Sequence, residues 1–384
     1  MTERTTAVRG EEGMKPVKVA FFPMHPVDDR ASGTFCALPA ARSADRGVVG
    51  TVFQPSSPKL YEFFYRRKTK GWQLRAAIYW YLIVLPRRLF QILRARRYDV
   101  IFVQRSMFRW LSPPVTEWIA GKVTGLPIAY HLDDGIWLEA RPRWSELRCR
   151  LAATVITGND VVAEFAERAG AKVTRIEYAV DVDAYPVKRH DNEHTVAIGY
   201  AGIYPDLHLA PIAEPLREVC EATGARVLVI GGLRRPQLGA LDPYLDWQAW
   251  DPGDEHSWIA AFDIGIMPLA DTELHRTKEP FKIKEYMAAG LPMVLSPVGH
   301  NAKVITDGRE GFFATDPDQW RDRLQALVED PHLRAEIGAK GRELALSRYD
   351  LPRLLDELSA VFLELAGRDL QDAATSLGNA RARI

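Results

Sequence analysis

Two lysines and a glutamate lie close together in the sequence, at Lys278, Lys282 and Glu285, just before a Gly-Leu-Pro sequence. Spacings of four and three residues predict that the three side chains share one face of a helix. The first turn of such a helix also offers free N–H groups and a positive dipole end, which favour phosphate. The pattern predicts a nucleoside diphosphate site, with the Glu285 carboxylate left to accept hydrogen bonds from sugar hydroxyls. The alternative is a solvated helical face on which Lys282 and Glu285 only form an ion pair.

A second candidate segment is the loop Ser296-Pro-Val-Gly299-His300-Asn301, which follows an apolar run. Gly299 would let a backbone N–H approach a phosphate or a sugar, because glycine carries no Cβ. His300 and Asn301 are therefore candidate donor-binding residues beside it. The alternative is an ordinary turn between a strand and a helix.

Acidic residues follow another apolar run, at Asp133 and Asp134, with His131 just before them. Ligands of open α/β sheets bind beyond the carboxyl ends of the strands, where these side chains would lie. Two adjacent carboxylates are costly to bury without a purpose. We expect them to contact an acceptor or its reacting hydroxyl, although His131 alone would be an ordinary core residue.

The elements that must position these residues alternate between apolar runs and helical segments, which predicts an α/β fold with parallel, doubly wound sheets. Residues 178–193 are polar and lack periodicity, which indicates a linker. We therefore expect a first Rossmann-like domain over 15–180, a linker over 181–193, a second Rossmann-like domain over 194–350 and a final helix and tail over 351–384. The apolar runs expected to form strands are 17–22, 48–53, 99–104, 127–131, 153–157, 173–176, 195–200, 226–230, 264–268 and 292–296.

The motif Lys278-x-x-x-Lys282-x-x-Glu285-Tyr-Met-Ala-Ala-Gly-Leu-Pro, followed by Ser296-Pro-Val-Gly299, Asp307-Gly308 and Gly311, resembles the donor-sugar half of retaining GT-B glycosyltransferases, family 4 in particular. The segment from Val103 to Trp137, with its strand ending in Asp-Asp, resembles the acceptor side of a subgroup. The resemblance covers most of the chain. It implies two Rossmann-like domains facing a central cleft, with the final helix packing back towards the first domain.

The resemblance also has implications for three further positions, Gly33, Gly202 and Thr277. Gly33 resembles the glycine that lets the first loop approach the donor diphosphate, and Gly202 resembles a glycine of the first phosphate-side loop of the second domain. The family has two glutamates eight residues apart, whereas Thr277 lies eight residues before Glu285 and the nearest glutamate is Glu279.

Composition limits the functional classes. The chain has 384 residues and a formal charge of zero from 50 basic and 50 acidic residues, which excludes a general nucleic-acid binder because phosphate backbones require a basic excess. Three separated cysteines, Cys36, Cys149 and Cys220, suit a reducing compartment. Residues 1–14 are polar, so we expect a disordered tail without a secretory signal and a cytoplasmic protein.

Aromatic and basic residues alternate over 59–97. The apolar centre, residues 76–85, is too short to span a bilayer. Two interpretations stay open: a basic, aromatic helical pair that contacts the inner face of an anionic membrane, or helices packed on the first sheet with solvated arginines.

The favoured function is transfer of a sugar from a nucleotide-sugar donor to a hydroxyl acceptor, lipid-linked or small, with retention as the resemblance implies. Lys278 and Lys282 would stabilise the leaving diphosphate. We expect no cofactor and no metal, because the nucleotide-sugar is a co-substrate. The alternatives are a nucleotide-sugar epimerase of the same fold and a non-catalytic nucleotide-sugar binding partner, the latter suggested by Thr277.

Overall fold

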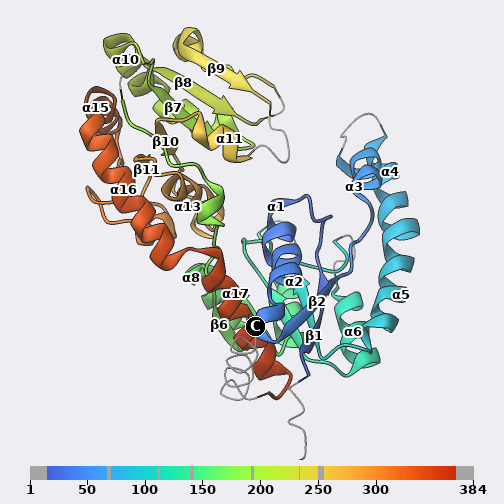
Figure 1. Cartoon of the computed structure of the whole chain (residues 1–384). Helices are drawn as coiled ribbons and strands as arrows, with labels where there is room; N and C mark the ends of the chain where they lie inside the picture. The colour runs from blue at the N-terminus through green and yellow to red at the C-terminus, as the bar shows by residue number, and fades with distance from the viewer. Residues whose placement is uncertain are drawn as a thin grey trace, which may run out of the picture. The chain divides into compact units, whose positions relative to one another are not determined.

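The computed structural model describes residues 15–66, 71–109, 113–138, 142–191, 194–232, 234–249 and 255–368 (Figure 1). The chain divides into two compact units. Unit 1 comprises Met1–Tyr130, Leu151–Ala153 and Leu355–Ile384, and unit 2 comprises His131–Arg150 and Thr154–Leu354. The expected disordered tail, residues 1–14, lies outside the described residues. The domain limits expected from the sequence stay a prediction.

The described strands form two six-stranded sheets, which confirms the predicted α/β class with two Rossmann-like sheets. The first has the order β2-β1-β3-β4-β5-β6 and the second the order β12-β11-β10-β7-β8-β9. The strands of the first sheet are β1 (Val17–Phe22), β2 (Val48–Val52), β3 (Val100–Gln104), β4 (Ile128–His131), β5 (Thr154–Thr157) and β6 (Val173–Arg175). Those of the second are β7 (Ala197–Ala201), β8 (Arg226–Ile230), β9 (Leu245–Gln248), β10 (Ile264–Met267), β11 (Met293–Leu295) and β12 (Phe312–Phe313).

Helices connect these strands. In the first half of the chain they are α1 (Arg30–Ser32), η1 (Gly33–Ala37), α2 (Leu38–Arg42), η2 (Ala44–Arg46), α3 (Pro58–Tyr61), η3 (Glu62–Arg66), α4 (Trp72–Ile78), η4 (Tyr79–Val84), α5 (Leu85–Ala95), α6 (Val115–Thr124), α7 (Pro142–Leu151), α8 (Asp160–Arg168) and η5 (Val182–Ala184). In the second half they are α9 (Pro205–Leu209), η6 (Ala210–Ile212), α10 (Ala213–Thr223), η7 (Gly239–Tyr244), α11 (Glu255–Ala260), α12 (Glu273–Arg276), α13 (Phe281–Ala288), α14 (Asn301–Val304), α15 (Pro317–Glu329), α16 (Pro331–Arg348) and α17 (Leu351–Leu365).

The central strands are apolar runs because both faces of a parallel sheet are covered. Every residue of β3, β4 and β5 is buried. Two edge strands were not among the predicted runs. β9 alternates between buried and exposed residues, and β12 has only two residues, so neither reads as a continuous apolar run.

The core of unit 1 includes an aromatic cluster to which α17 contributes. Phe362 of α17 makes edge-on contacts with Phe21 at 5.6 Å and Phe102 at 5.8 Å between ring centroids. Such aromatic pairs add about 0.5–1.5 kcal/mol to the burial of apolar area. The later part of α17 is thereby held on strands β1 and β3.

A continuous helical run in unit 1 comprises α4, η4 and α5, from Trp72 to Ala95 (Figure 1). Among the described residues it is the one helix whose 24 residues have the length and composition of a membrane span. The length argument made from residues 76–85 is therefore wrong for the helix as a whole, because the helix extends well beyond its apolar centre. Length and composition alone do not distinguish a spanning helix from a core helix.

Candidate functional site

The segment from Thr277 to Glu285 belongs to unit 2 and surrounds the start of α13. The prediction that Lys278 shares a helical face with Lys282 and Glu285 is wrong, because α13 begins at Phe281 with Pro280 as its N-cap. A residue that precedes a proline is disfavoured in helical geometry, so the helix cannot extend back through Glu279. Lys278 therefore lies in the loop ahead of the helix.

Glu285 is buried, and Tyr185 and Lys282 are among its partners. The Tyr185 hydroxyl donates to Glu285 Oε1 at 2.8 Å, and Lys282 Nζ lies 3.3 Å from Glu285 Oε2. The Lys282 side chain is 25% exposed, whereas that of Glu285 is fully buried. The ion pair of the alternative interpretation is present, but its carboxylate is not on a solvated face.

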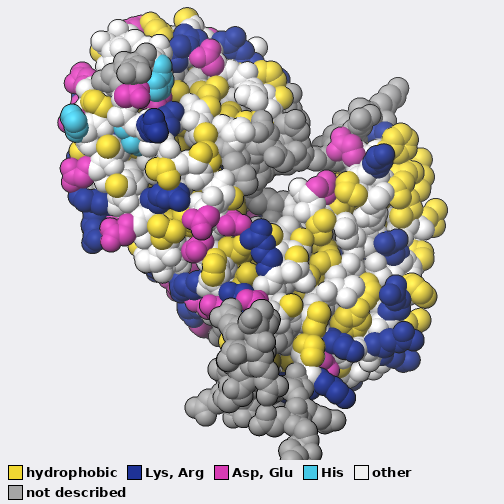
Figure 2. Space-filling model, viewed as in Figure 1, with side chains coloured by type: hydrophobic (Ala, Val, Ile, Leu, Met, Phe, Trp, Pro, Cys, Tyr) yellow, Lys and Arg dark blue, Asp and Glu magenta, His cyan; other side chains and the backbone are white. Residues whose placement is uncertain are grey.

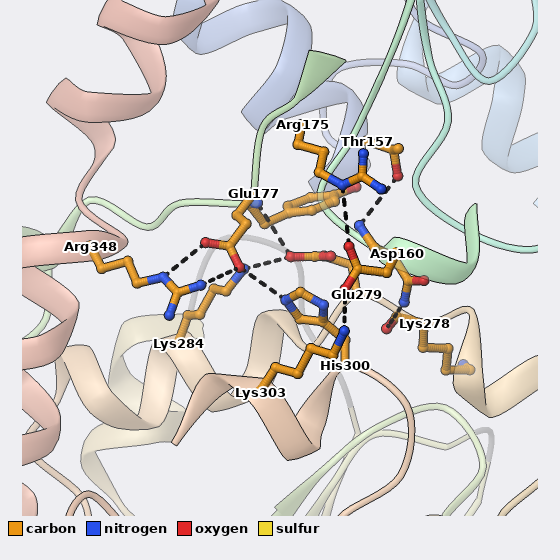
Figure 3. Close-up of polar contacts among 12 residues, drawn as sticks. Thr157, Asp160, Arg175, Glu177, Lys278, Glu279, Lys284, His300, Lys303 and Arg348 are labelled. Atoms are coloured by element: carbon orange, nitrogen blue, oxygen red, sulfur yellow. Dashed lines mark hydrogen bonds and ion pairs between the residues drawn. The ribbon is translucent and has the colours of Figure 1, made fainter. Parts of the chain in front are cut away.

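The segment Thr277–Glu285 contains a second ion pair, between Lys284 and Glu279, which was not predicted from the sequence. Lys284 Nζ lies 2.6 Å from Glu279 Oε1, with side chains 0% and 4% exposed (Figure 3). The ammonium also lies 4.7 Å from the Tyr349 ring centroid. Glu279 Oε2 is buried without a hydrogen-bond partner among the described residues. Lys284 and Glu279 are five residues apart with a proline between them, a spacing that does not predict a pair on one helical face.

His300, a predicted donor-binding residue, belongs to a neighbouring charged group. His300 Nε2 lies 3.0 Å from Glu177 Oε1, and Arg348 Nε donates to Glu177 Oε2 at 3.1 Å (Figure 3). Burial acts to raise the pKa of Glu177, but the His300 hydrogen bond and the charges of Lys284 and Arg348 outweigh it and lower the pKa to about 2. Glu177 is therefore a fixed negative charge that orients the imidazole.

The surface side of this region carries a further ion-pair chain. Lys303 pairs with Asp160, and Arg175 Nε lies 3.3 Å from the same carboxylate. The Lys303 hydrogen bond is the main reason that the pKa of Asp160 is lowered. Each of these side chains is more than a third exposed, so we expect the chain to contribute little to stability.

The Asp-Asp segment after β4 contacts the segment before α13. The Tyr178 hydroxyl donates to the Asp133 carboxylate, and the Tyr178 ring packs edge-on against His131 at 5.8 Å. Gly135 N donates to Thr277 Oγ1 at 3.0 Å. A Cβ at Gly135 would lie 2.5 Å from that oxygen, so only glycine fits there.

Thr277 thus joins two of the segments that the sequence singled out. Its hydroxyl also donates to Leu274 O at 2.8 Å, and the residue is completely buried. The residue that departs from the family pattern holds the Asp-Asp loop in place. Asp134, in the same loop, is half-buried.

Asn159 supports the same segment from another side, and the sequence gave no signal for this role. Its Nδ2 donates to Arg276 O at 3.0 Å and Lys278 O at 3.1 Å. Its Oδ1 caps α8 by accepting from Val161 N at 2.8 Å and Val162 N at 3.2 Å. One amide therefore fixes both the start of α8 and the backbone that carries Lys278.

The predicted loop after β11 forms a tight turn. Gly299 has a φ of 57°, and a Cβ there would lie 2.6 Å from Arg276 Cα, so the turn packs directly on the end of α12. Asn301 is buried and donates to Ser296 O at 3.2 Å, which closes the turn from within. The two residues shape the loop, and His300 between them provides its polar side chain.

The glycines of the other predicted loops lie in different places. Gly202 follows β7, and a Cβ at Gly231 would lie 2.3 Å from Gly202 O, so the two loops touch. Gly33 opens the π-helical turn η1 in unit 1, where a Cβ would lie 3.1 Å from Val27 O. Trp247 of β9 donates its indole N–H to the same loop, at Gly231 O and 2.8 Å.

His208 belongs to α9 and is half-buried. Burial, together with the charges of His275 and Lys278, lowers the pKa of His208 to about 4. Its Nδ1 lies 2.7 Å from the Tyr200 hydroxyl. His208 is therefore neutral at pH 7 and acts as a hydrogen-bonding group.

Two cavities open at the carboxyl edge of the second sheet. The larger, about 420 Å³, follows the ends of β10, β11 and β12, and its lining includes His208, Leu269, Ser296, Thr315, Asp316 and Trp320. The smaller, about 290 Å³, is lined by Asn159, Arg276, Gly299, His300 and Lys303 among others. The cavities share Asp271, Pro297 and Val298, so they adjoin each other.

Only some of the predicted site residues line these two cavities. Gly299 and His300 line the smaller one, whereas Lys278, Lys282 and Glu285 line neither. Ser296 opens the loop that the sequence singled out, whereas Thr315 was missed because it follows β12 without a distinctive motif. Among the described residues there is no cluster of His, Cys, Asp and Glu that could hold a metal ion. The arrangement suits an elongated anionic ligand with an apolar end.

Comparison with known proteins identifies part of the chain. Residues 198–330 match the family model described as glycosyl transferases group 1, so this segment carries a domain of that family. Spore coat protein SA of Bacillus subtilis is 33% identical over 81 residues, which cover 20% of this chain and 22% of that protein. D-inositol 3-phosphate glycosyltransferase of Paenarthrobacter aurescens is 31% identical over 86 residues, 21% of this chain and 19% of that protein. The chain thus matches about a fifth of the length of these curated relatives.

Solved structures share the fold over nearly the whole chain. Anabaena HepE in complex with UDP has a TM-score of 0.64 at 17% identity and covers 91% of this chain and 100% of its own. Sucrose-phosphate synthase from Thermosynechococcus elongatus has a TM-score of 0.65 at 13% identity and covers 91% of this chain and 99% of its own. The fold is therefore that of GT-B glycosyltransferases, as the sequence predicted.

Proposed function

We propose that this chain is a glycosyltransferase that moves a sugar from a nucleotide-sugar to a hydroxyl acceptor. One observation carries the proposal: the larger cavity is lined entirely by residues between Leu207 and Trp320, all of them within the segment that matches glycosyl transferases group 1. Anabaena HepE, which shares the fold, is described as binding UDP and UDP-glucose. A uridine diphosphate sugar is accordingly the first donor to test.

The donor would occupy the two adjoining cavities of unit 2. The apolar lining of the larger cavity suits the nucleoside, and His300 and the Gly299 turn of the smaller cavity suit the diphosphate. Lys278, whose charge reaches His208 at the larger cavity, would neutralise the leaving diphosphate together with Lys282. This cationic support would replace a metal ion, which is why we propose metal-independent transfer.

The anomeric configuration of the sugar would be retained if the acceptor hydroxyl attacks on the face from which the diphosphate leaves. The leaving phosphate would then take the acceptor proton, so no protein nucleophile is needed. Asp133 and Asp134 would orient the acceptor, with the Tyr178 hydroxyl holding the first of them. We further propose that the protein belongs to glycosyltransferase family 4, that it acts in the cytoplasm, and that its acceptor is a lipid-linked or small hydroxyl compound.

The first experiment is a thermal-shift panel of UDP, GDP, ADP and CDP. A ligand at about 100 times its Kd stabilises the folded protein by about 2.7 kcal/mol, which raises Tm measurably. We expect one diphosphate to dominate, and the shift to shrink in Lys282→Ala. Lys340→Ala, which removes a surface lysine of α16, is the matched control. A panel without any shift would contradict the proposed donor site.

Turnover separates the proposal from its alternatives. A glycosyltransferase releases nucleoside diphosphate and forms a glycoside when a matched acceptor is present. An epimerase would return an isomer of the sugar without an acceptor, and a binding partner would bind the donor without turnover. Product analysis by mass spectrometry and NMR, which also reports the anomeric configuration, decides among the three.

A further inference from the structure

The outward side of the helix Trp72–Ala95 in unit 1 carries exposed apolar side chains from its first turn to its last. This outward face is formed by exposed large side chains, with exposed fractions between 39% and 71%: Leu74, Tyr81, Leu82, Leu89, Phe90 and Leu93. Figure 2 shows hydrophobic side chains crowded along this side of the unit, interrupted by Lys and Arg. Isolated exposed leucines are ordinary, but a continuous row of this kind marks an interaction surface.

The π-helical turn η4 keeps the exposed apolar side chains on either side of it on the same face of the helix. Leu93 follows Leu74 by 19 residues, which in a regular α-helix places it roughly 100° around the axis, at 3.6 residues per turn. The wider turn at Tyr79–Val84 takes up about one extra residue and brings the two ends back into line. The backbone is thus shaped so that the exposed apolar side chains at both ends of the helix lie on one face.

The charged residues of this segment are all basic. Residues 63–98 contain ten basic residues and no acidic residue, in a chain whose formal charge is zero. Arg87, Arg94, Arg96 and Arg97 are exposed. Arg87 Nε donates to Gln54 O and Arg96 Nε to Val123 O, both neutral carbonyls, so these bonds leave the positive charges uncompensated.

The inward side of the helix is fastened to unit 1. Tyr79, Trp80 and Val84 are completely buried in an apolar cluster. The Arg88 guanidinium is also buried and donates to the carbonyls of Phe53, Pro23 and Met107. A helix that crosses a bilayer would expose these groups to lipid, so the helix can only meet a membrane with its outward face.

We propose that the outward face docks on an anionic lipid bilayer, with the helix lying in the plane of the interface. Apolar side chains enter the acyl boundary while the flanking arginines meet lipid phosphates, the arrangement by which interfacial helices bind. A cavity of about 620 Å³ between the helix and the end of β2 is lined by Leu60, Phe90, Arg87 and Arg94 among others, and it can take a lipid head group. Docking does not depend on the proposed function. Only the further step, delivery of a lipid-linked acceptor, rests on it.

The test is co-sedimentation of the whole chain with phosphatidylcholine vesicles that either contain or lack phosphatidylglycerol. We expect binding that requires the anionic lipid and falls as salt is raised. The combined change Arg87→Gln, Arg94→Gln and Arg97→Gln should weaken binding by roughly fivefold for each arginine, about 1 kcal/mol each. Arg66, Arg67, Lys68 and Lys70 are left unchanged, because their side chains lie outside the described residues.

Matched controls use exposed residues of unit 2. Arg150→Gln, Arg168→Gln and Arg309→Gln remove the same charge, and they should leave binding unchanged. Leu82→Ser with Phe90→Ser should abolish binding, whereas Val187→Ser with Leu346→Ser should not. Circular dichroism and Tm establish that each variant is folded.

Three outcomes would overturn the proposal. Protein that stays in the supernatant at low salt excludes a membrane surface. Protein that resists extraction by alkaline carbonate spans the bilayer instead. A dimer that is detected by light scattering and dispersed by the Leu82 and Phe90 changes assigns the face to a second copy of the chain. Nucleotide binding measured in solution should be normal in every surface variant, so failure of docking and failure of the proposed function remain distinguishable.

Discussion

The segment around α13 in unit 2 and the helix Trp72–Ala95 in unit 1 are both rich in basic side chains, yet they treat those charges in opposite ways. In unit 2, Lys282, Lys284 and Arg348 each lie beside a carboxylate of the same unit. In residues 63–98 no carboxylate is present, and Arg87, Arg94, Arg96 and Arg97 are exposed. Internal pairing fixes the geometry of a site, whereas unmatched exposed charge is suited to an external anion.

The strongest test of this contrast is removal of Lys284. The change Lys284→Met leaves the buried Glu279 carboxylate without its ion-pair partner, and breaking a buried pair in this way costs about 3–5 kcal/mol of unfolding free energy. Urea denaturation measures the loss. The double variant Lys284→Met, Glu279→Gln should recover part of it, because no lone charge remains. A loss below about 1 kcal/mol for the single variant would contradict the tight pairing.

Glu177 offers a test by pH. Its pKa falls from 4.5 to about 2 in the folded protein. A lowered carboxylate pKa contributes stability that is present above pH 4.5 and is lost as the pH falls towards 2, by about 3 kcal/mol for a shift of this size. We expect Glu177→Gln to be less stable than the wild type at pH 7, with the difference narrowing on acidification. If the free energies of unfolding of the two proteins differ by the same amount from pH 7 to pH 2, the Glu177 charge does not stabilise the fold.

A smaller effect is expected where Thr277 holds the Asp-Asp loop. The change Thr277→Val keeps the shape but removes the acceptor for Gly135 N, and an unsatisfied buried N–H costs about 1–3 kcal/mol. Thr277→Ser keeps the hydroxyl and is the control. Thermal unfolding of the two variants gives the comparison, and equal midpoints would show that the hydroxyl bond is dispensable.

The smallest effect belongs to the exposed arginines of unit 1. Arg94→Gln should change the free energy of unfolding by no more than about 0.5 kcal/mol, because surface changes away from caps and networks are near neutral. The same denaturation assay applies. A loss of several kcal/mol would mean that Arg94 serves the fold, and the contrast between the two regions would then fail.

Most of the architecture could be predicted because strands β1, β3 and β7 are short apolar runs bounded by polar or turn residues. The site was harder. Lys278 was placed on α13, but that helix begins only after Pro280, an error that attention to the residue before a proline would have avoided. The contacts of Asn159 with Arg276 and of Tyr185 with Glu285 join residues about a hundred positions apart, and one sequence contains no signal for such pairs. Periodicity identifies buried faces, whereas polar pairings across a fold depend on the packed geometry.

Loss of the Asn159 amide would disturb the backbone at Arg276 and Lys278, which carries part of the proposed donor site. Asparagine is one of the thermolabile side chains, and loss of its amide nitrogen leaves an aspartate. The helix cap on Val161 and Val162 would survive, since that cap uses the side-chain oxygen, but the carbonyls of Arg276 and Lys278 would then face a carboxylate instead of a donor. A stored preparation could therefore keep its secondary structure while it loses nucleotide affinity, and mass spectrometry of the peptide that contains residue 159 would reveal the cause.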